Sequence, residues 1–244
     1  MIAVRLLSLA LLTATIASAD PALLARVETL AGTYHEDPKA LDTLRDEVTR
    51  AVERDARTDL LIALARVSFI WGDVRATSPA QKLDAYERGR EAARRAAERE
   101  PKNALAHLWY AVNTGRWGQT KGVVRSLFLL PEVQREIDTV IALDPNLTPV
   151  YSLAGNVYSE VPGMLGGDLA KAEAMFRKGL DQDRHFTGMR VGLAKTLIKL
   201  GRIVEARREL DAVLAETAPR NRADFVVKDT PEARRLLESI RGKS

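Results

Sequence analysis

The sequence contains no cysteine, and this absence excludes several kinds of chemistry at once. Without thiols the chain has no disulfides, no thiolate nucleophile, no cysteine-ligated metal and no lipoprotein anchor. Histidine is also scarce, with three residues, and aromatic residues make up only 5% of the chain. A chain without disulfides depends on its own core, and a hydrophobic content of 46% is sufficient to form one.

An excess of charge of one sign is lacking too, because the formal net charge is only +4 over 244 residues. The arginine-rich stretch from Arg88 to Arg99 alternates with glutamate and alanine, which is typical of a solvated helix face. A nucleic-acid surface needs concentrated positive charge, and no run of the sequence supplies it. We therefore expect no nucleic-acid partner.

The first nineteen residues have the features of a signal peptide. Arg5 supplies a positive charge, Leu6 to Ile16 form an apolar run, and Ala17-Ser18-Ala19 is a small-residue cleavage site. The run is too short to span a bilayer comfortably. We predict cleavage after Ala19 and a periplasmic or secreted mature chain with no membrane span.

Paired apolar faces at helical spacing recur after Asp20, and almost no segment alternates as a strand would. Between residues 190 and 219 two such faces flank Gly201. They consist of Leu193, Ala194 and Leu197, then Ala206, Leu210 and Val213. One unit earlier the equivalent places hold Tyr151, Ala154, Gly155 and Tyr158, then Ala172, Phe176 and Gly179. Recurring helix pairs of this kind predict a repeat array.

Prolines mark the joins between the units. Pro101 in "EREPKNALAHLWYAV" and Pro145 in "ALDPN" each follow one helix and precede the next. The spacing resembles a tetratricopeptide repeat, and stepping by its register places four units at residues 58–219. We expect residues 20–57 to form a helical pair that caps one end. Residues 220–244 are expected to cap the other end with a helix from Thr230 to Ile240.

Three of these units carry extra residues between their paired helices. The insertions read "GDVRATSPAQK", "GRWGQTKGVVRSLFLLP" and "VPGMLGG" in chain order. Insertions at equivalent turns of a solenoid fall on one edge, where they can build a shared surface. In the third, Gly163, Gly166 and Gly167 are candidates for positive-φ turn geometry. Two interpretations stay open, a functional surface and a simple accommodation of packing.

The interrupted repeats resemble two more specific families. One is the T-component of TRAP transporters, and the other is the tetratricopeptide domain of regulator-of-microtubule-dynamics proteins. "AHLWYAV", the helix that starts at "GGD" and the closing "DTPEARRLLESI" carry this resemblance. The first family implies a periplasmic helical protein that pairs with a solute-binding protein and handles a small ligand.

Candidate catalytic groups are few, and none forms a recognisable constellation. His35, His107 and His185 lie far apart, and none has a metal-ligand partner at helical spacing. Asp168 is a natural N-cap for the helix that follows it, although a helix N-terminus after glycines could also accept an anion. "GMLGGD" lacks the Lys-Ser/Thr of a phosphate loop. We expect no catalytic residue, no metal and no cofactor, and hence a protein that is not an enzyme.

A binding groove is the better candidate for a functional site. The tetratricopeptide resemblance implies that the first helix of each pair lines the concave side. Registering the units puts ten residues there: Arg66, Phe69, Leu108, Val112, Arg116, Ser152, Asn156, Glu160, Lys195 and Lys199. A peptide clamp for carboxylates would need a lysine where Ser152 stands.

The insertions supply a second candidate surface. Trp117, between Arg116 and Gly118, is expected in a loop and exposed, and an exposed tryptophan beside arginine is typical of a binding surface. Trp109 is expected in the core. The apolar run "SLFLLP", residues 126–131, is either buried beneath the array or a patch that faces a partner.

Together these features predict an all-α, tetratricopeptide-like helical-hairpin solenoid with insertions between paired helices. We expect an exported scaffold that binds a protein or peptide partner in the cell envelope. The alternative is a T-component-like protein that handles a small ligand. A continuous apolar lining near Phe69, Leu108 and Val112 would favour the small ligand, and an open polar groove would favour peptides.

Overall fold

The computed structural model describes residues 19–243, and over this range the chain forms helices and turns without a strand. The predicted all-α class is therefore confirmed. The remainder of the predicted signal peptide, residues 1–18, lies outside the described residues, and its cleavage stays a prediction.

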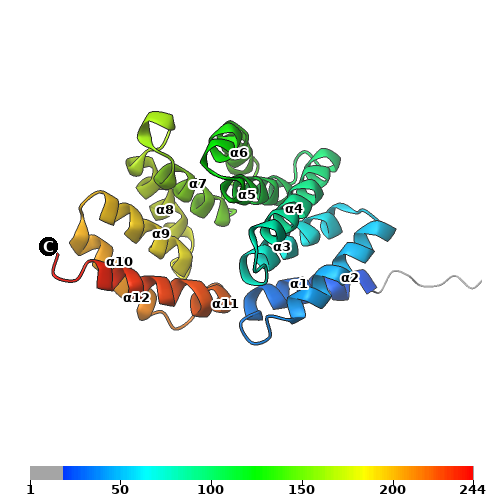
Figure 1. Cartoon of the computed structure of the whole chain (residues 1–244), viewed down its shortest axis with the longest axis horizontal. Helices are drawn as coiled ribbons and strands as arrows, with labels where there is room; N and C mark the ends of the chain where they lie inside the picture. Colours follow the sequence, from blue (N-terminus) through cyan, green and yellow to red (C-terminus); the bar gives the residue numbers. More distant parts are fainter. Residues whose placement is uncertain (1–18, 244) are drawn as a thin grey trace, which may run out of the picture.

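Helices pack as successive hairpins along the chain (Figure 1). The pairs are α1 (Ala19–Thr33) with α2 (Ala40–Arg54), α3 (Thr58–Val74) with α4 (Pro79–Arg99), α5 (Ala104–Lys121) with α6 (Val123–Leu143), α7 (Pro149–Glu160) with α8 (Leu169–Gln182), and α9 (Thr187–Lys199) with α10 (Ile203–Leu214). The chain ends in α11 (Arg222–Asp224), a π-helical turn η3 (Phe225–Asp229) and α12 (Thr230–Ser239).

Local signals explain where several helices begin. The Ser78 hydroxyl accepts a hydrogen bond from the Gln81 amide at 3.2 Å, and Pro79 occupies the first turn of α4. Asp168 caps α8 as the sequence predicts, since its Oδ1 accepts from the amides of Ala170 and Lys171 at 3.0 Å each. These caps satisfy amide groups that would otherwise lack a partner at the helix start.

Two of the three insertions lengthen helices and leave only short loops. The second insertion is helical except for Gly122, whose φ of 112° makes the turn between α5 and α6. As a result α6 has 21 residues, whereas α8 has 14. Only the third insertion stays a loop, with a short 3₁₀ helix, η2 (Gly163–Leu165). The N-terminal half of the array therefore has the deeper walls.

Small residues set how closely the hairpins approach. Phe176 of α8 has no exposed surface and packs between Gly155 of α7 and Gly192 of α9. A Cβ atom at either glycine would lie 2.6 Å from the phenyl ring. The glycine and alanine positions of the repeat thus exist because a large side chain from the next helix fills the space above them.

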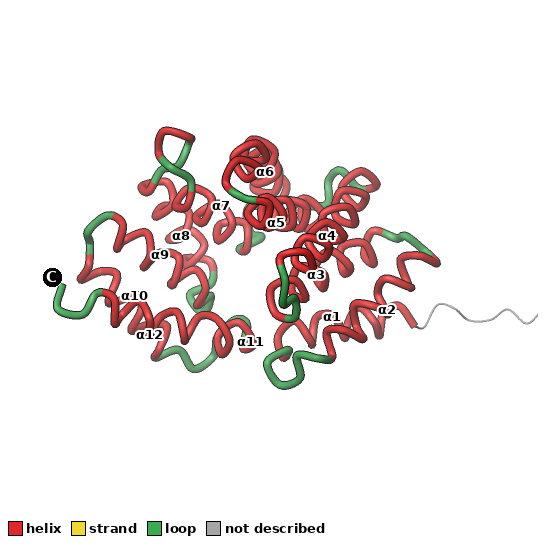
Figure 2. Tube along the Cα trace, viewed as in Figure 1, coloured by secondary structure: helices red, strands yellow, loops and turns green. Residues whose placement is uncertain are grey.

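The array curves until its two ends meet (Figures 1 and 2). The Tyr34 hydroxyl, just after α1, donates to Asp224 of α11 at 2.7 Å, and the Asn221 side chain donates to the Ala31 carbonyl at 3.1 Å. Ala223 is buried in the core formed by the first hairpins, although it lies near the end of the chain. The C-terminal segment therefore closes the solenoid into a ring.

The packing of Phe176 gives a direct test of the core. We expect Phe176→Ala to lower the free energy of unfolding by about 3–5 kcal/mol, because it removes a fully buried ring between two glycines. Phe128→Ala is the matched control: that ring is 77% exposed, so the change should stay within about 0.5 kcal/mol. Urea unfolding followed by circular dichroism measures both, and equal effects would contradict the packing described.

Candidate functional site

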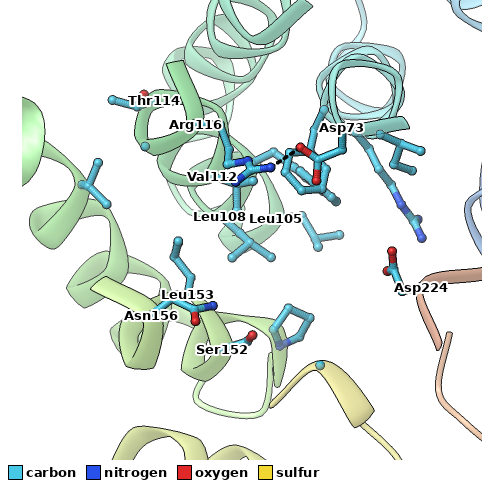
Figure 3. A pocket seen from close by; sticks show the side chains of 18 of the residues that line it. Asp73, Leu105, Leu108, Val112, Thr114, Arg116, Ser152, Leu153, Asn156 and Asp224 are labelled. Atoms are coloured by element: carbon cyan, nitrogen blue, oxygen red, sulfur yellow. Dashed lines mark hydrogen bonds and ion pairs between the residues drawn. The ribbon is translucent and has the colours of Figure 1, made fainter. Parts of the chain in front are cut away.

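The ring surrounds a cavity of about 1650 Å³ on the concave side of the array. Its wall consists of residues from α1, α3, α5, α7 and α9, the start of α6, and the closing segment of α11, η3 and α12. Figure 3 shows that α5 presents its apolar side chains to this cavity opposite α7, where Ser152, Leu153 and Asn156 lie. The predicted groove thus corresponds to the cavity inside the ring.

Apolar side chains from several helices line the cavity. Leu105 of α5 leaves 44% of its surface exposed on this wall. Further large apolar residues of the wall include Leu24, Ile62, Phe69, Leu108, Trp109, Val112, Leu127, Leu130, Leu153 and Val157. The rings of Phe69 and Trp109 lie 5.7 Å apart between their centroids. This surface favours contact with an apolar molecule or an apolar helix face.

Asp73, at the end of α3, is the centre of a partly buried polar cluster. It pairs with Arg116 of α5, accepts a hydrogen bond from the Tyr86 hydroxyl at 2.6 Å, and lies 3.3 Å from the Lys228 ammonium (Figure 3 shows the contact with Arg116). Burial alone would raise the pKa of Asp73, but the charges of Arg116 and Lys228 hold that pKa below its ordinary value. The carboxylate is therefore charged at neutral pH.

Lys228 joins this cluster to the ring closure. Its ammonium also pairs with Asp224 at 3.0 Å, and Asp224 accepts from Tyr34. Burial would lower the pKa of Lys228, but the carboxylates of Asp224 and Asp73 raise it above its ordinary value. Burial and the Asp224 carboxylate both raise the pKa of Tyr34, so its hydroxyl remains a donor. Each cation in this part of the cavity is therefore paired with a carboxylate.

Basic residues elsewhere in the cavity wall also pair with carboxylates. Each basic residue that lines the cavity has a carboxylate partner: Arg57 with Asp59, Arg66 with Glu28, Arg116 with Asp73, Lys195 with Glu232, Arg220 with Asp183, and Lys228 with Asp73 and Asp224. Because each of these cations is neutralised by a carboxylate, the cavity offers no unpaired positive charge from its described residues, and its apolar side chains are its main binding surface. An anion is thus a poorer match for it than an apolar occupant.

The structure brings nine of the ten predicted groove residues to this one cavity: Arg66, Phe69, Leu108, Val112, Arg116, Ser152, Asn156, Glu160 and Lys195. Lys199 is the exception. Its ammonium donates to the backbone carbonyl of Ser159 at 2.5 Å, so it fixes the end of α9 to α7 outside the wall. Whether the nine bind a partner stays a prediction.

The C-terminal segment contributes residues that the sequence pattern did not reveal. Asp224 of α11 and Lys228 and Asp229 of the π-helical turn line the cavity, where they contact Tyr34, Asp73 and Thr187. The only signal for them in the sequence is the charge in the stretch before Thr230. The sequence predicts this segment as an end cap, and a cap gives no reason to expect these three residues in the groove.

The prediction that Trp117 lies in an exposed loop is wrong. It lies within α5 and is half-buried, because the insertion continues the helix to Lys121. Three cations surround its ring, with Arg90, Lys121 and Arg125 at 5.7, 5.4 and 5.2 Å from the centroid.

The apolar run at residues 126–131 is neither wholly buried nor wholly exposed. Leu129 is buried, whereas Phe128 is 77% exposed.

The three predicted loop glycines have different reasons for being glycine. Gly166 has a φ of 100°, which side chains rarely adopt. Gly167 has no positive φ, but a Cβ there would lie 1.7 Å from the Val161 carbonyl oxygen. Gly163 meets neither condition and starts η2. The loop is therefore a compact turn, and two of its glycines are explained by backbone geometry and packing.

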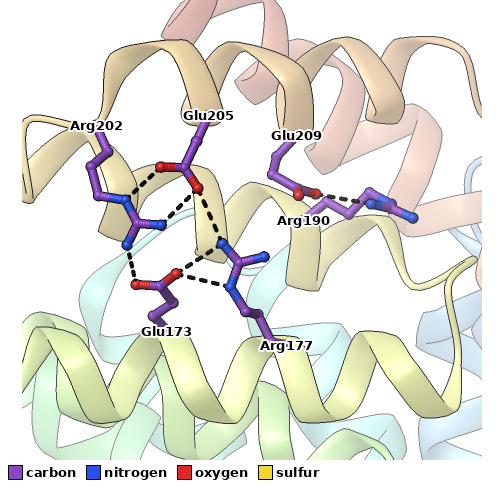
Figure 4. A network of polar contacts seen from close by, with 6 residues as sticks. All are labelled: Glu173, Arg177, Arg190, Arg202, Glu205 and Glu209. Atoms are coloured by element: carbon purple, nitrogen blue, oxygen red, sulfur yellow. Dashed lines mark hydrogen bonds and ion pairs between the residues drawn. The ribbon is translucent and has the colours of Figure 1, made fainter.

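Two carboxylates outside the cavity form a network with arginines. Figure 4 shows Glu173 of α8 and Glu205 of α10 held by Arg177 and Arg202, with Arg202 donating to both carboxylates at 2.5 and 2.6 Å. The hydrogen bond from Arg202 lowers the pKa of Glu205. These carboxylates stay charged and tie neighbouring helices together, which is a structural task.

Histidine and carboxylate side chains form contacts that suit structure better than metal binding. Across residues 19–243, no group of three or more His, Asp and Glu side chains is arranged to hold a metal ion. His107 and His185 each contact a glutamate, at 2.6 Å for Glu136 and 3.1 Å for Glu216. Within the same range no helix is long and apolar enough to cross a membrane.

Comparison with known proteins defines the class first. A tetratricopeptide-repeat model matches residues 164–226. The crystal structure of a thermophilic tetratricopeptide protein from Thermus thermophilus has a TM-score of 0.67 at 18% identity, and covers 91% of this chain and 99% of that chain. PilF of Pseudomonas aeruginosa gives 0.53 at 18% identity, with 92% and 94% covered. The chain has the tetratricopeptide fold, which supports a role in protein interaction and is generally a non-catalytic scaffold.

The family follows from a second match. The model described as regulator of microtubule dynamics protein 1-3 matches residues 23–178, and this chain belongs to that family. The curated regulator of microtubule dynamics protein 3 of Rattus norvegicus is 25% identical over 241 residues, which covers 85% of this chain. The chain spans 50% of that relative's length. The resemblance seen in the sequence is confirmed for this family.

Asp229 makes stability depend on pH. Burial raises the pKa of Asp229 from 3.8 to about 6, although its carboxylate accepts from the Thr187 hydroxyl at 2.6 Å. The folded state binds this proton more tightly than the unfolded state, so the stabilisation is complete below pH 3.8 and is lost as pH rises to about 6. Over that window stability should fall by about 1.4 kcal/mol per pH unit relative to Asp229→Asn, which does not titrate.

Urea unfolding of the two proteins at pH 4, 5, 6 and 7 measures the difference. The gap between them should change up to about pH 6 and then level off. A gap that stays constant over the whole series would show that Asp229 titrates as an ordinary carboxyl group.

Proposed function

We propose that this chain is an exported, non-enzymatic scaffold that holds an apolar segment of a protein partner in its central cavity. One observation carries the proposal: the first helices of the hairpins surround a cavity of about 1650 Å³ that is lined by many apolar side chains and whose cations are each paired with a carboxylate. The tetratricopeptide fold supports protein interaction in general.

The size of the cavity suits a helical segment. A helix with side chains is about 10–12 Å across and rises about 1.5 Å per residue, so 1650 Å³ holds roughly 10–14 residues. An amphipathic helix that binds in a groove presents apolar residues at i, i+3, i+4 and i+7. Leu105, Leu108 and Val112 offer a matching stripe along α5.

The proposed location is the cell envelope. Its support is the pattern of the first nineteen residues, a charged start, an apolar run and a small-residue cleavage site. The microtubule role in the name of the rat relative is not part of the proposal, because an exported chain would not meet microtubules.

A second candidate is a protein like the T-component of TRAP transporters, which would pair with a solute-binding protein and handle a small ligand. A specific observation favours it: Phe69, Leu108 and Val112 lie on one continuous cavity wall and not on an open polar groove. An apolar small molecule would fit such a wall as well as a helix does.

A substitution in the cavity tests both candidates. Leu105→Glu should weaken capture of the partner at least tenfold, because it places a charge on the apolar wall. Leu214→Glu is the matched control, since Leu214 is 38% exposed on α10 and does not line the cavity. Arg116 is a poor probe, because its removal would leave Asp73 with one cation fewer.

The measurement is capture from envelope extract by each immobilised variant, with mass spectrometry of the purified proteins in parallel. A protein held by the parent chain and Leu214→Glu but lost by Leu105→Glu supports the scaffold. A co-purifying small molecule with the same pattern supports the second candidate. Binding that Leu105→Glu leaves unchanged contradicts a role for the cavity.

A further inference from the structure

A cluster of exposed apolar side chains lies outside the cavity, at the turns between paired helices. Val124 and Phe128 of α6 are 85% and 77% exposed, and Met164 and Leu165 of the η2 loop are 92% and 45% exposed. We call these four residues the turn edge. None of them lines the cavity, so the turn edge is independent of the proposed function.

The two halves of the turn edge lie on the same side of the ring. Gln119, near the end of α5, donates to Glu160 at the end of α7 at 3.1 Å, which places the two turns next to each other. In Figure 1 the loop between α7 and α8 projects from the periphery of the array. The apolar side chains therefore stand on projecting turns and not in a concave pocket.

The charges beside Phe128 are basic and lack acidic partners. Lys121 and Arg125 contact no carboxylate among the described residues, and their cations lie 5.4 and 5.2 Å from the Trp117 ring centroid. From residue 101 to residue 131 the sequence contains no Asp or Glu. The acidic groups nearest to the η2 loop are occupied, since Glu160 accepts from Gln119 and Asp168 caps α8.

This combination fits a lipid surface better than a protein. Aromatic residues, methionine and arginine are enriched in protein–protein interfaces, but lysine is depleted there, and the energetic centres of such interfaces are well-packed pockets, which projecting turns do not form. Projecting apolar side chains flanked by lysine and arginine, with an aromatic ring between, are typical of segments that rest in the headgroup region of a bilayer. Anionic headgroups attract such cations without requiring shape complementarity.

We propose that the turn edge docks onto an anionic lipid surface. Phe128, Val124 and Met164 enter the boundary between headgroups and acyl chains, and Lys121 and Arg125 meet lipid phosphates. In this orientation the ring stands with its inserted turns toward the membrane.

Vesicle binding tests the proposal. A chain that begins at Asp20 keeps the hairpins and removes the apolar N-terminal run, which would bind lipid by itself. It should sediment with phosphatidylcholine vesicles that contain phosphatidylglycerol, and much less with phosphatidylcholine alone. Lys121→Gln and Arg125→Gln should each reduce partitioning about fivefold, and Phe128→Ser about tenfold.

Two control variants test whether vesicle binding belongs to the turn edge. Val204→Ser, at a residue 55% exposed on α10, and Leu105→Glu in the cavity should bind vesicles like the parent chain. Circular dichroism checks that every variant is folded. No binding by the parent chain, or binding that Phe128→Ser leaves unchanged, overturns the proposal. A dimer that Phe128→Ser converts to a monomer would assign the turn edge to a second copy of the chain and also overturn it.

Discussion

The contact between Lys228 and Asp73 is the interaction on which the shape of this protein depends. It joins the last helical segment to the second hairpin across 155 residues of sequence, within a cluster that also contains Arg116 and Tyr86. A partly buried cluster of this kind costs desolvation and contributes less to net stability than to a single arrangement of the parts, since loss of one partner leaves a charge unpaired. The cavity exists because these groups hold the ends of the array together.

The cavity and the turn edge differ in their charges, although both expose apolar side chains. The cavity lies inside the ring, and the turn edge lies outside it. Inside, each basic residue of the wall has a carboxylate partner, so apolar contact dominates. Outside, Lys121 and Arg125 stand without carboxylates beside exposed Phe128. The second insertion contributes to both surfaces, because Leu127 and Leu130 line the cavity and Phe128 of the same helix is exposed outside it. A single amphipathic stretch therefore serves two environments.

The sequence predicts those features of the fold and the groove that follow from the local spacing of residues. Ala154, Gly155 and Phe176 mark the packing of one unit, and nine groove positions follow from the same register. The register misplaces Lys199, which lies at the last turn of α9, where its side chain reaches the Ser159 carbonyl. Trp117 is misplaced because the glycines near it suggest a loop, whereas they lie inside α5. Lys228 and Asp229 could not be placed, since their partners are distant in sequence and no periodic pattern relates them.

Closure also fixes how many hairpins the molecule can have. An open solenoid can gain or lose a repeat, because each unit contacts only its neighbours. Here Tyr34 and Asp224 are 190 residues apart and still share a hydrogen bond, so one hairpin more or fewer would pull them apart. Unfolding of any one hairpin would likewise release both ends, which couples the stability of distant units. The number of hairpins in this ring is therefore fixed. Duplication of a repeat in the gene would not lengthen the array but would separate its two ends.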